Sequence, residues 1–302
     1  MRFGVHVGIG GGFAKSVAEA LAAKCECIQL FAGNPRGWRT TPYNPSAWQE
    51  FARLRKAHDI RPAVIHTSYL INLASADTTL RNKSAALIAH DLVVAAKGEI
   101  EYVNTHLGSY GEQARTKGFA KVCSALIRLI KKAPPGPMLL LENSASGGNR
   151  CAGSLEELGE FLRAIGSQRV GVCLDTAHLW ASGYEIATKK GVERMLAAAD
   201  KYIGLDKIRV LHINDTRVAL GARHDAHWHV AKGNIGAAGF RALFACRGLA
   251  HAACICETPK TPELDAANVR TAKRLAGRRR SAIGTTPKLT KALTATFNRA
   301  IR

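Results

Sequence analysis

The sequence predicts one (β/α)₈ barrel followed by a short basic tail, and three observations lead to this fold class. The chain has 302 residues, of which 47% are apolar and 22% charged, as expected for one globular domain of barrel size. Eight short apolar runs alternate with longer amphipathic runs, which is typical of parallel strands joined by crossover helices. No uninterrupted apolar run approaches the ~20 residues of a membrane-spanning helix.

The strands are predicted from runs of five or six residues rich in apolar side chains. In chain order they are Phe3–Val7, Cys27–Phe31, Pro62–His66, Tyr102–His106, Met138–Glu142, Val170–Asp175, Ile208–Ile213 and Ala253–Glu257. Such short runs suit strands that are buried on both faces, as in a parallel sheet covered by helices.

The helices are predicted from the amphipathic runs that follow the strands. Asn44-Pro45-Ser46 supplies a start signal for the second helix, and Ser154 with Glu157 forms a capping box for the fifth. The predicted ranges are Ala14–Ala23, Ser46–His58, Leu80–Ala96, Phe119–Lys131, Leu155–Ile165, Gly191–Ala199, Ala237–Phe244 and Glu263–Leu275.

The domain organisation follows from the continuity of this pattern. No composition break or linker interrupts the chain before Gly277, so we expect one barrel domain over residues 1–276 and a tail over residues 277–302. Eight repeats of the strand–helix unit fit a closed barrel. An open, doubly wound sheet remains the alternative here, because periodicity alone does not distinguish the two architectures.

Six successive predicted strands have a residue that can bind a metal ion at their last position or, for the seventh strand, one residue before it. A barrel places its active site at the carboxyl ends of its strands. Clustered carboxylates repel one another unless a cation offsets their charge, so this pattern predicts a metal site. The six residues are His66, His106, Glu142, Asp175, His212 and Glu257.

Further candidate ligands lie in the predicted loops. His178 comes three residues after the sixth strand, and Asp225 and His227 follow the seventh. His224 and His229 are alternatives that spacing alone does not exclude. Nitrogen and carboxylate ligands without a required thiolate suit zinc, and manganese is also compatible.

The charge of the chain favours a polyanionic partner. Lys and Arg total 43 against 23 Asp and Glu, which gives +20 and an isoelectric point near 10.0. Residues 277–302 hold seven basic and no acidic residues. The body of the chain, residues 1–276, therefore has 36 basic and 23 acidic residues and a net charge of +13. Nucleic acid is the first candidate partner, and a solvated surface is the alternative. The run Arg278–Arg280 would be a solvent-exposed part of the terminus, a nonspecific DNA-binding arm or a nuclear localisation signal.

The remaining sequence features predict no second chemistry. The eight cysteines form no Cys-x-x-Cys pair, and we expect buried, reduced thiols. The glycine-rich start, Gly8–Gly12, departs from both phosphate-loop and dinucleotide patterns and predicts a tight turn. Met1 to Val5 leads directly into a strand without a secretory signal, so we expect a cytoplasmic protein, nucleoid-associated in a bacterium.

Six segments of the sequence carry a family resemblance. They are His66-Thr-Ser-Tyr69-Leu70, Glu142-Asn143-Ser-Ala, Cys173-Leu-Asp175-Thr-Ala-His178, His212-Ile-Asn214-Asp215, Gly233-Asn-Ile-Gly236 and Glu257-Thr258-Pro259. Through these segments the chain resembles, between Phe3 and Leu275, the endonuclease IV family of apurinic/apyrimidinic endonucleases. The resemblance implies a TIM barrel with a trinuclear zinc site.

The resemblance implies three zinc ions, with Glu142 shared between two of them and manganese as a substitute at one or more sites. It favours Asp225 and His227 over His224 and His229. It also implies that Glu142, Asp175 and Glu257 are catalytic. The three implied ligand sets are His66, His106 and Glu142; Glu142, Asp175, His212 and Glu257; and His178, Asp225 and His227.

The substrate implied by the resemblance is duplex DNA that contains abasic sites. Cleavage 5′ to the lesion would leave a 3′-hydroxyl and a 5′-deoxyribose phosphate, and blocked 3′ ends would also be trimmed. Asn34 and Arg36 would contact DNA, and Tyr69 and Leu70 would wedge beside the abasic nucleotide. We expect a monomer.

Two other classes of protein are alternatives. Metal-dependent sugar isomerases or epimerases of the xylose isomerase-like group share this barrel. They would use a set equivalent to Glu142, Asp175, His212 and Glu257, and would leave the other candidate ligands without a role. A DNA-binding protein without catalysis would require a lost ligand, and none of the nine is missing.

Overall fold

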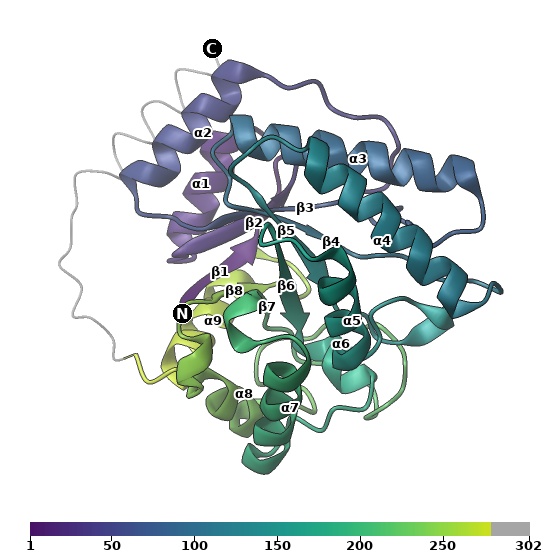
Figure 1. Cartoon of the computed structure of the whole chain (residues 1–302). Helices are drawn as coiled ribbons and strands as arrows, with labels where there is room; N and C mark the ends of the chain where they lie inside the picture. Colours follow the sequence, from purple (N-terminus) through teal and green to yellow (C-terminus); the bar gives the residue numbers. More distant parts are fainter. Residues whose placement is uncertain (279–302) are drawn as a thin grey trace.

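The computed structural model describes residues 1–278, which form a closed barrel of eight parallel strands in sequence order (Figure 1). Strand β1 pairs with both β2 and β8, which excludes the open sheet. The strands are β1 (Arg2–His6), β2 (Cys27–Phe31), β3 (Ala63–His66), β4 (Tyr102–Thr105), β5 (Met138–Glu142), β6 (Val170–Asp175), β7 (Ile208–His212) and β8 (Ala253–Cys256).

The α-helices surround the strands (Figure 1). They are α1 (Phe13–Ala22), α2 (Pro45–Ala57), α3 (Thr78–Lys97), α4 (Arg115–Lys132), α5 (Leu155–Ile165), α6 (Thr176–Ala181), α7 (Lys189–Tyr202), α8 (Gly236–Phe244) and α9 (Pro262–Leu275). Short 3₁₀ turns occupy Gly147–Asn149, Leu205–Lys207 and Arg247–Leu249. The eight predicted helices are confirmed, α5 with the predicted bounds and the others with shifted ends, and α6 is an additional helix in a segment expected as a loop.

Side-chain caps begin several of these helices. Asn44 accepts a hydrogen bond from the Ala47 amide at the start of α2, and Ser154 accepts one from the Glu157 amide at α5. Each cap satisfies a backbone N–H that lacks a partner inside the helix. The Glu157 carboxylate accepts from the Gly153 amide, one residue before the position that a capping box predicts.

The core has two layers. Outside the strands, apolar side chains of the sheet pack against the helices in one large cluster. Inside the barrel, the buried set is Cys27, Val64, Leu140, Cys173, Val210, Ala253 and Ile255. These side chains fill the interior of the barrel below its carboxyl end and are called the apolar floor. The polar residues at the carboxyl end pack directly above them. All eight cysteines are free thiols, and all but Cys246 are buried.

The strand ends differ slightly from the predicted ones. His106 lies one residue beyond β4 and Glu257 one residue beyond β8, although both were expected inside strands. Backbone pairing between strands ends before each of these residues, so both lie at the start of the loop that follows the strand. Leu275 ends the last helix and a turn follows at Ala276–Gly277. Of the predicted tail, residues 279–302 lie outside the described residues.

Candidate metal centre

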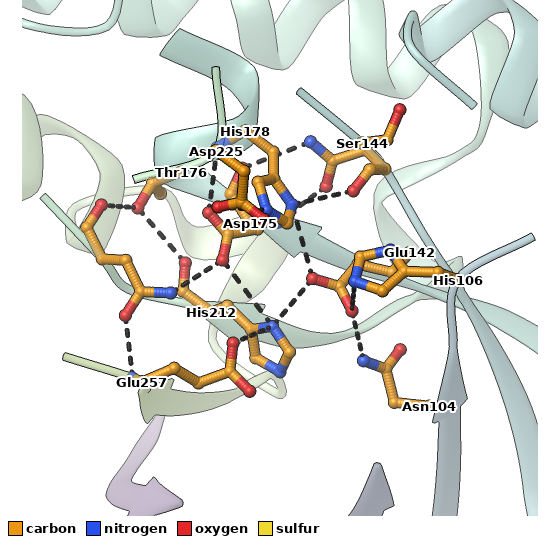
Figure 2. A network of polar contacts seen from close by, with 12 residues as sticks. Asn104, His106, Glu142, Ser144, Asp175, Thr176, His178, His212, Asp225 and Glu257 are labelled. Atoms are coloured by element: carbon orange, nitrogen blue, oxygen red, sulfur yellow. Dashed lines mark hydrogen bonds and ion pairs between the residues drawn. The ribbon is translucent and has the colours of Figure 1, made fainter. Parts of the chain in front are cut away.

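The carboxyl ends of the strands bring the predicted ligands into one polar cluster (Figure 2). The β6–β7 register sets Asp175 opposite His212, and β2–β3 pairing sets His66 opposite Phe31. Because all strands are parallel, their last residues meet at the same end of the barrel. Histidine and carboxylate side chains from β3, β5, β6 and β7 therefore converge on one another.

Glu142 lies at the centre of this cluster. Its Oε2 atom is 3.2 Å from His66 Nε2 and 3.5 Å from His106 Nε2. The Asn104 amide donates a 2.6 Å hydrogen bond to the same oxygen. Ligand atoms of His66, His106 and Glu142 lie close enough together to hold one ion.

A second group shares Glu142 and surrounds His212. The Nδ1 atom of His212 is 3.0 Å from Glu142 Oε1, 3.1 Å from Glu257 Oε2 and 3.8 Å from Asp175 Oδ2. Asn214 donates a 2.7 Å hydrogen bond to Asp175 Oδ2. Glu142, Asp175, His212 and Glu257 together form a four-residue group of suitable size for an ion.

Helix α6 explains how His178 reaches the site. Asp175 caps this helix, since its Oδ1 accepts a 3.0 Å hydrogen bond from the His178 amide. The sharp turn from β6 into α6 points the His178 ring back over the strand ends, as Figure 2 shows. His178, Asp175 and His227 form the third group whose ligand atoms converge.

Asp225 borders this third group. Its Oδ1 atom is 3.2 Å from His178 Nε2 and 3.3 Å from His227 Nε2. His227 Nε2 is also 3.3 Å from Asp175 Oδ2, so Asp175 faces both the second and third groups. The three groups therefore form one continuous cluster rather than separate sites.

The loop that carries Asp225 and His227 is closed at its base by Asp215. Asp215 pairs with Trp228 through both backbone hydrogen bonds and accepts from the amides of Ile235 and Gly236. The Arg217 guanidinium stacks 3.5 Å from the centroid of the Trp228 ring. These contacts fix the loop over the strand ends.

The same loop distinguishes the alternative histidines. The Nδ1 atom of His229 is 3.1 Å from the Asn268 amide, which also donates to Thr258. His224 is exposed and belongs to none of the three convergent groups. Among the described residues, the loop thus directs Asp225 and His227 toward the cluster, and His229 toward α9.

The electrostatics of the cluster are dominated by burial and by opposite charges. Burial lowers the pKa of His106 to about 4. Burial also opposes the charged form of His178, but Asp175 and Asp225 outweigh it and raise that pKa to about 10. Burial likewise raises the pKa of Glu142, yet His106 and His212 hold it well below its usual range. Glu142 is therefore ionised, and its buried negative charge attracts cations.

The donor set fits divalent cations. The Nε2 atoms of His178 and His227 are buried and form no hydrogen bond within residues 1–278, although both lie within 3.3 Å of a carboxylate oxygen. Buried polar atoms are normally hydrogen-bonded, so such atoms call for another partner. Imidazole nitrogens and carboxylate oxygens around a shared centre are the ligands that zinc and manganese take.

Two loops beside the cluster carry the predicted DNA-contacting residues. The Pro35 carbonyl accepts hydrogen bonds from the Tyr69 amide and the Ser68 hydroxyl, which joins the loop after β2 to the loop after β3. Arg36 is exposed, and the Asn34 carboxamide oxygen accepts from its amide. Tyr69 is 59% exposed and packs its ring edge against Phe31.

An open groove of about 650 Å³ borders the loop after β3 and reaches Asp225 at the edge of the cluster. Tyr69, Leu70 and Asp225 are among the residues that line it. Arg150 and Arg223 also line it, which gives the groove two cations beside the metal ligands. A bound polyanion would thus meet positive charge before it reaches the cluster.

Sequence reasoning missed three polar residues in or around the cluster. Gln29 and Asn104 lie inside strands and bond to Glu257 and Glu142, respectively. Cys173 forms a convergent group with Glu142 and His212. A signal existed for each: Gln29 and Asn104 interrupt apolar strand runs, and Cys173 shares a face with Asp175 two residues later.

The fold and the site first define a broad class of protein, a TIM barrel with a candidate metal centre at the carboxyl ends of its strands. Residues 17–277 match the family model described as a xylose isomerase-like TIM barrel. A probable endonuclease 4 from Natranaerobius thermophilus is 39% identical over 280 residues, which cover 92% of this chain and 99% of that protein. Endonuclease 4 from one strain of Thermus thermophilus is 40% identical over 272 residues, covering 89% of this chain and 96% of the relative. The chain therefore belongs to the endonuclease IV family of apurinic/apyrimidinic endonucleases.

Solved structures agree with this assignment. The crystal structure of endonuclease IV from a second strain of Thermus thermophilus superposes with a TM-score of 0.83 at 36% identity, covering 92% of this chain and all of that one. A D-tagatose 3-epimerase-like protein reaches a TM-score of 0.68 at 18% identity and shares the fold alone. No helix within residues 1–278 is long and apolar enough to cross a membrane.

Proposed function

We propose that this protein hydrolyses the phosphodiester 5′ to abasic sites in duplex DNA, using three zinc ions held by the clustered ligands. The products would be a 3′-hydroxyl and a 5′-deoxyribose phosphate, and the same site would trim blocked 3′ ends. The proposal is supported by the family membership and by the donor set of the cluster. Zinc is preferred because the nine side chains are imidazoles and carboxylates, and manganese would also fit.

One observation carries the proposal: histidines surround the central carboxylates on both sides. A sugar isomerase would need only the group of Glu142, Asp175, His212 and Glu257. Here His66 and His106 approach Glu142 on one side, and His178 and His227 approach Asp175 and Asp225 on the other. These additional ligands suit a site with several ions, an arrangement that many phosphatases and nucleases use.

The chemistry of bound ions would be Lewis acidity, which activates water near neutral pH and offsets the negative charge that grows on the phosphate. The chain itself orients the ligands. Glu142 would be shared between the first two ions, since its two carboxylate oxygens face different histidines. We assign Glu142, Asp175 and Glu257 as catalytic because they would hold the ions that act on the reacting phosphate.

The DNA would be recognised by the two joined loops. Arg36 would approach the backbone, while Tyr69 and Leu70 would fill the space beside the abasic nucleotide. Extrusion of a nucleotide without a base costs less than extrusion of a paired one, which gives selectivity for the lesion. We also predict that the protein is a monomer, that it is cytoplasmic, and that residues 277–302 form a separate basic tail.

The decisive experiment uses a labelled duplex with one tetrahydrofuran abasic analogue. The zinc-loaded full chain should cut it once, 5′ to the analogue, and leave an undamaged duplex intact. Glu257→Gln should greatly depress cutting while the barrel stays folded. Glu156→Gln makes the same chemical change on the exposed face of α5 and should cut normally. Conversion of a ketose, with the lesion duplex left uncut, would support the isomerase alternative instead.

A further inference from the structure

Gln29 lies in the middle of β2, and its side chain is fully buried. Its Nε2 atom donates to Glu257 Oε1 at 2.5 Å and lies 3.1 Å from His6 Nδ1. Its Oε1 atom lies 2.9 Å from His212 Nε2. One carboxamide thus connects a residue at the end of β1, a ligand on β7 and a ligand just beyond β8.

The orientation of this carboxamide follows from its partners. A Glu257 carboxylate oxygen only accepts hydrogen bonds, so it must face the NH₂ group of Gln29 and not the carbonyl. The carbonyl oxygen of Gln29 then faces His212 and can only accept. His212 must therefore carry a hydrogen on Nε2 and donate it to Gln29.

This hydrogen bond decides which nitrogen of His212 remains for an ion. With Nε2 protonated, Nδ1 is the ring nitrogen whose lone pair can bind a metal. Nδ1 is the atom that faces Glu142 Oε1 and Glu257 Oε2, at 3.0 and 3.1 Å. The same amide also draws one oxygen of Glu257 toward β2, which leaves Oε2 directed at His212.

We propose that Gln29 is a positioning residue that fixes the His212 tautomer and the Glu257 orientation for the ion between them. The inference rests on the proposed metal site and names a residue outside its ligand set. Gln29 has no part in the apolar floor, although Cys27, two residues earlier on the same strand, belongs to it. A buried amide that is satisfied on both sides by ligands contributes orientation that an apolar side chain cannot supply.

The test compares three variants of the full chain. Gln29→Met has a similar length and removes every hydrogen bond; Gln29→Leu serves the same purpose if Met does not fold. Cys27→Ala is the matched control, because it disturbs the barrel interior on the same strand without touching His212 or Glu257. Zinc dissociation is measured by chelator competition, and cobalt-loaded protein gives a visible spectrum that reports ligand geometry.

We expect Gln29→Met to weaken the binding of one zinc ion by about 10- to 100-fold, as the loss of an outer-shell partner does. The cobalt spectrum should change, and kcat should fall with little change in KM. Cys27→Ala should bind zinc as the wild type does. Unchanged zinc affinity and cobalt spectrum in Gln29→Met would overturn the positioning role. A wild type that binds no zinc or cobalt would overturn the proposed function instead.

Discussion

The Nε2 atom of His178 lies 3.2 Å from Asp225 Oδ1 but forms no hydrogen bond with it. The two residues come from separate elements, since His178 lies on α6 and Asp225 on the long loop before α8. His178 is buried, whereas the Asp225 side chain is 53% exposed. The exposed carboxylate therefore completes a buried group from the solvent side, and its removal should not disturb the barrel.

Asp225→Asn is expected to lose one of three zinc ions and to keep the other two. The substitution removes the negative charge that faces His178 and His227, while the groups around Glu142 remain complete. A bound cation supplies several kcal/mol of charge stabilisation to a phosphoryl transition state, so cleavage should fall by about 100-fold or more. Metal analysis and cleavage of the tetrahydrofuran duplex measure the two effects.

His224→Ala provides the control for this loop. His224 is exposed, adjoins Asp225 and belongs to none of the convergent groups formed by the described residues. This variant should retain all three ions, and metal content is its readout because His224 also lines the groove. Loss of an ion in His224→Ala, with full retention in Asp225→Asn, would reverse the ligand assignment within the loop.

The sequence alone predicts most of the barrel and six strand-end residues of the cluster. Apolar runs locate the strands, and a parallel barrel brings their carboxyl ends together. His66 and Glu142 could therefore be placed near each other although 76 residues separate them. The predicted strands extend one residue too far at His106 and Glu257 because the residue pattern does not mark where backbone pairing between strands stops.

Other parts of the site cannot be read from a pattern. Helix α6 has six residues, too few for helical periodicity, and its start depends on the Asp175 cap. Gln29 and His212 are 183 residues apart and meet across the inside of the barrel. Their contact depends on the tilt of the strands and on side-chain direction, which spacing along the chain does not encode.

Tyr69→Ala is expected to weaken binding of lesion-containing duplex without loss of metal. Tyr69 is 59% exposed, so the free energy of unfolding should change by less than about 0.5 kcal/mol. Stacking of an aromatic ring on a base is worth about 1–3 kcal/mol, which corresponds to roughly 5- to 150-fold in Kd. Tyr69→Phe keeps the ring and should bind normally. Equal binding by the Ala variant would exclude Tyr69 as a wedge.

Asp265→Asn tests a pH effect away from the metal centre. Burial of Asp265 near the start of α9, assisted by Glu19, raises its pKa from 3.8 to about 6. The folded state therefore binds this proton more tightly than the unfolded chain, so stability falls as pH rises from about 4 to about 6. At pH 7 the Asn variant should be more stable by about 1 kcal/mol after solvent screening, and at pH 4 the two should be equal. Urea unfolding at both pH values, with a chelator present, measures the difference, and a gain that is the same at both would contradict this origin.

The excess of positive charge predicts a steep dependence of DNA binding on salt. The body of the chain keeps +13 without residues 277–302, and bound zinc would offset the ligand carboxylates and add to this charge. Each phosphate neutralised on duplex DNA contributes about 0.9 to the slope of log K against log salt. Fluorescence anisotropy with Glu257→Gln on the tetrahydrofuran duplex should therefore show affinity falling steeply between about 50 and 200 mM salt. Deletion of residues 277–302 should lower the affinity and the slope modestly and leave cleavage intact. If the deletion abolished cleavage, the charge that holds DNA would belong to the tail and not to the barrel.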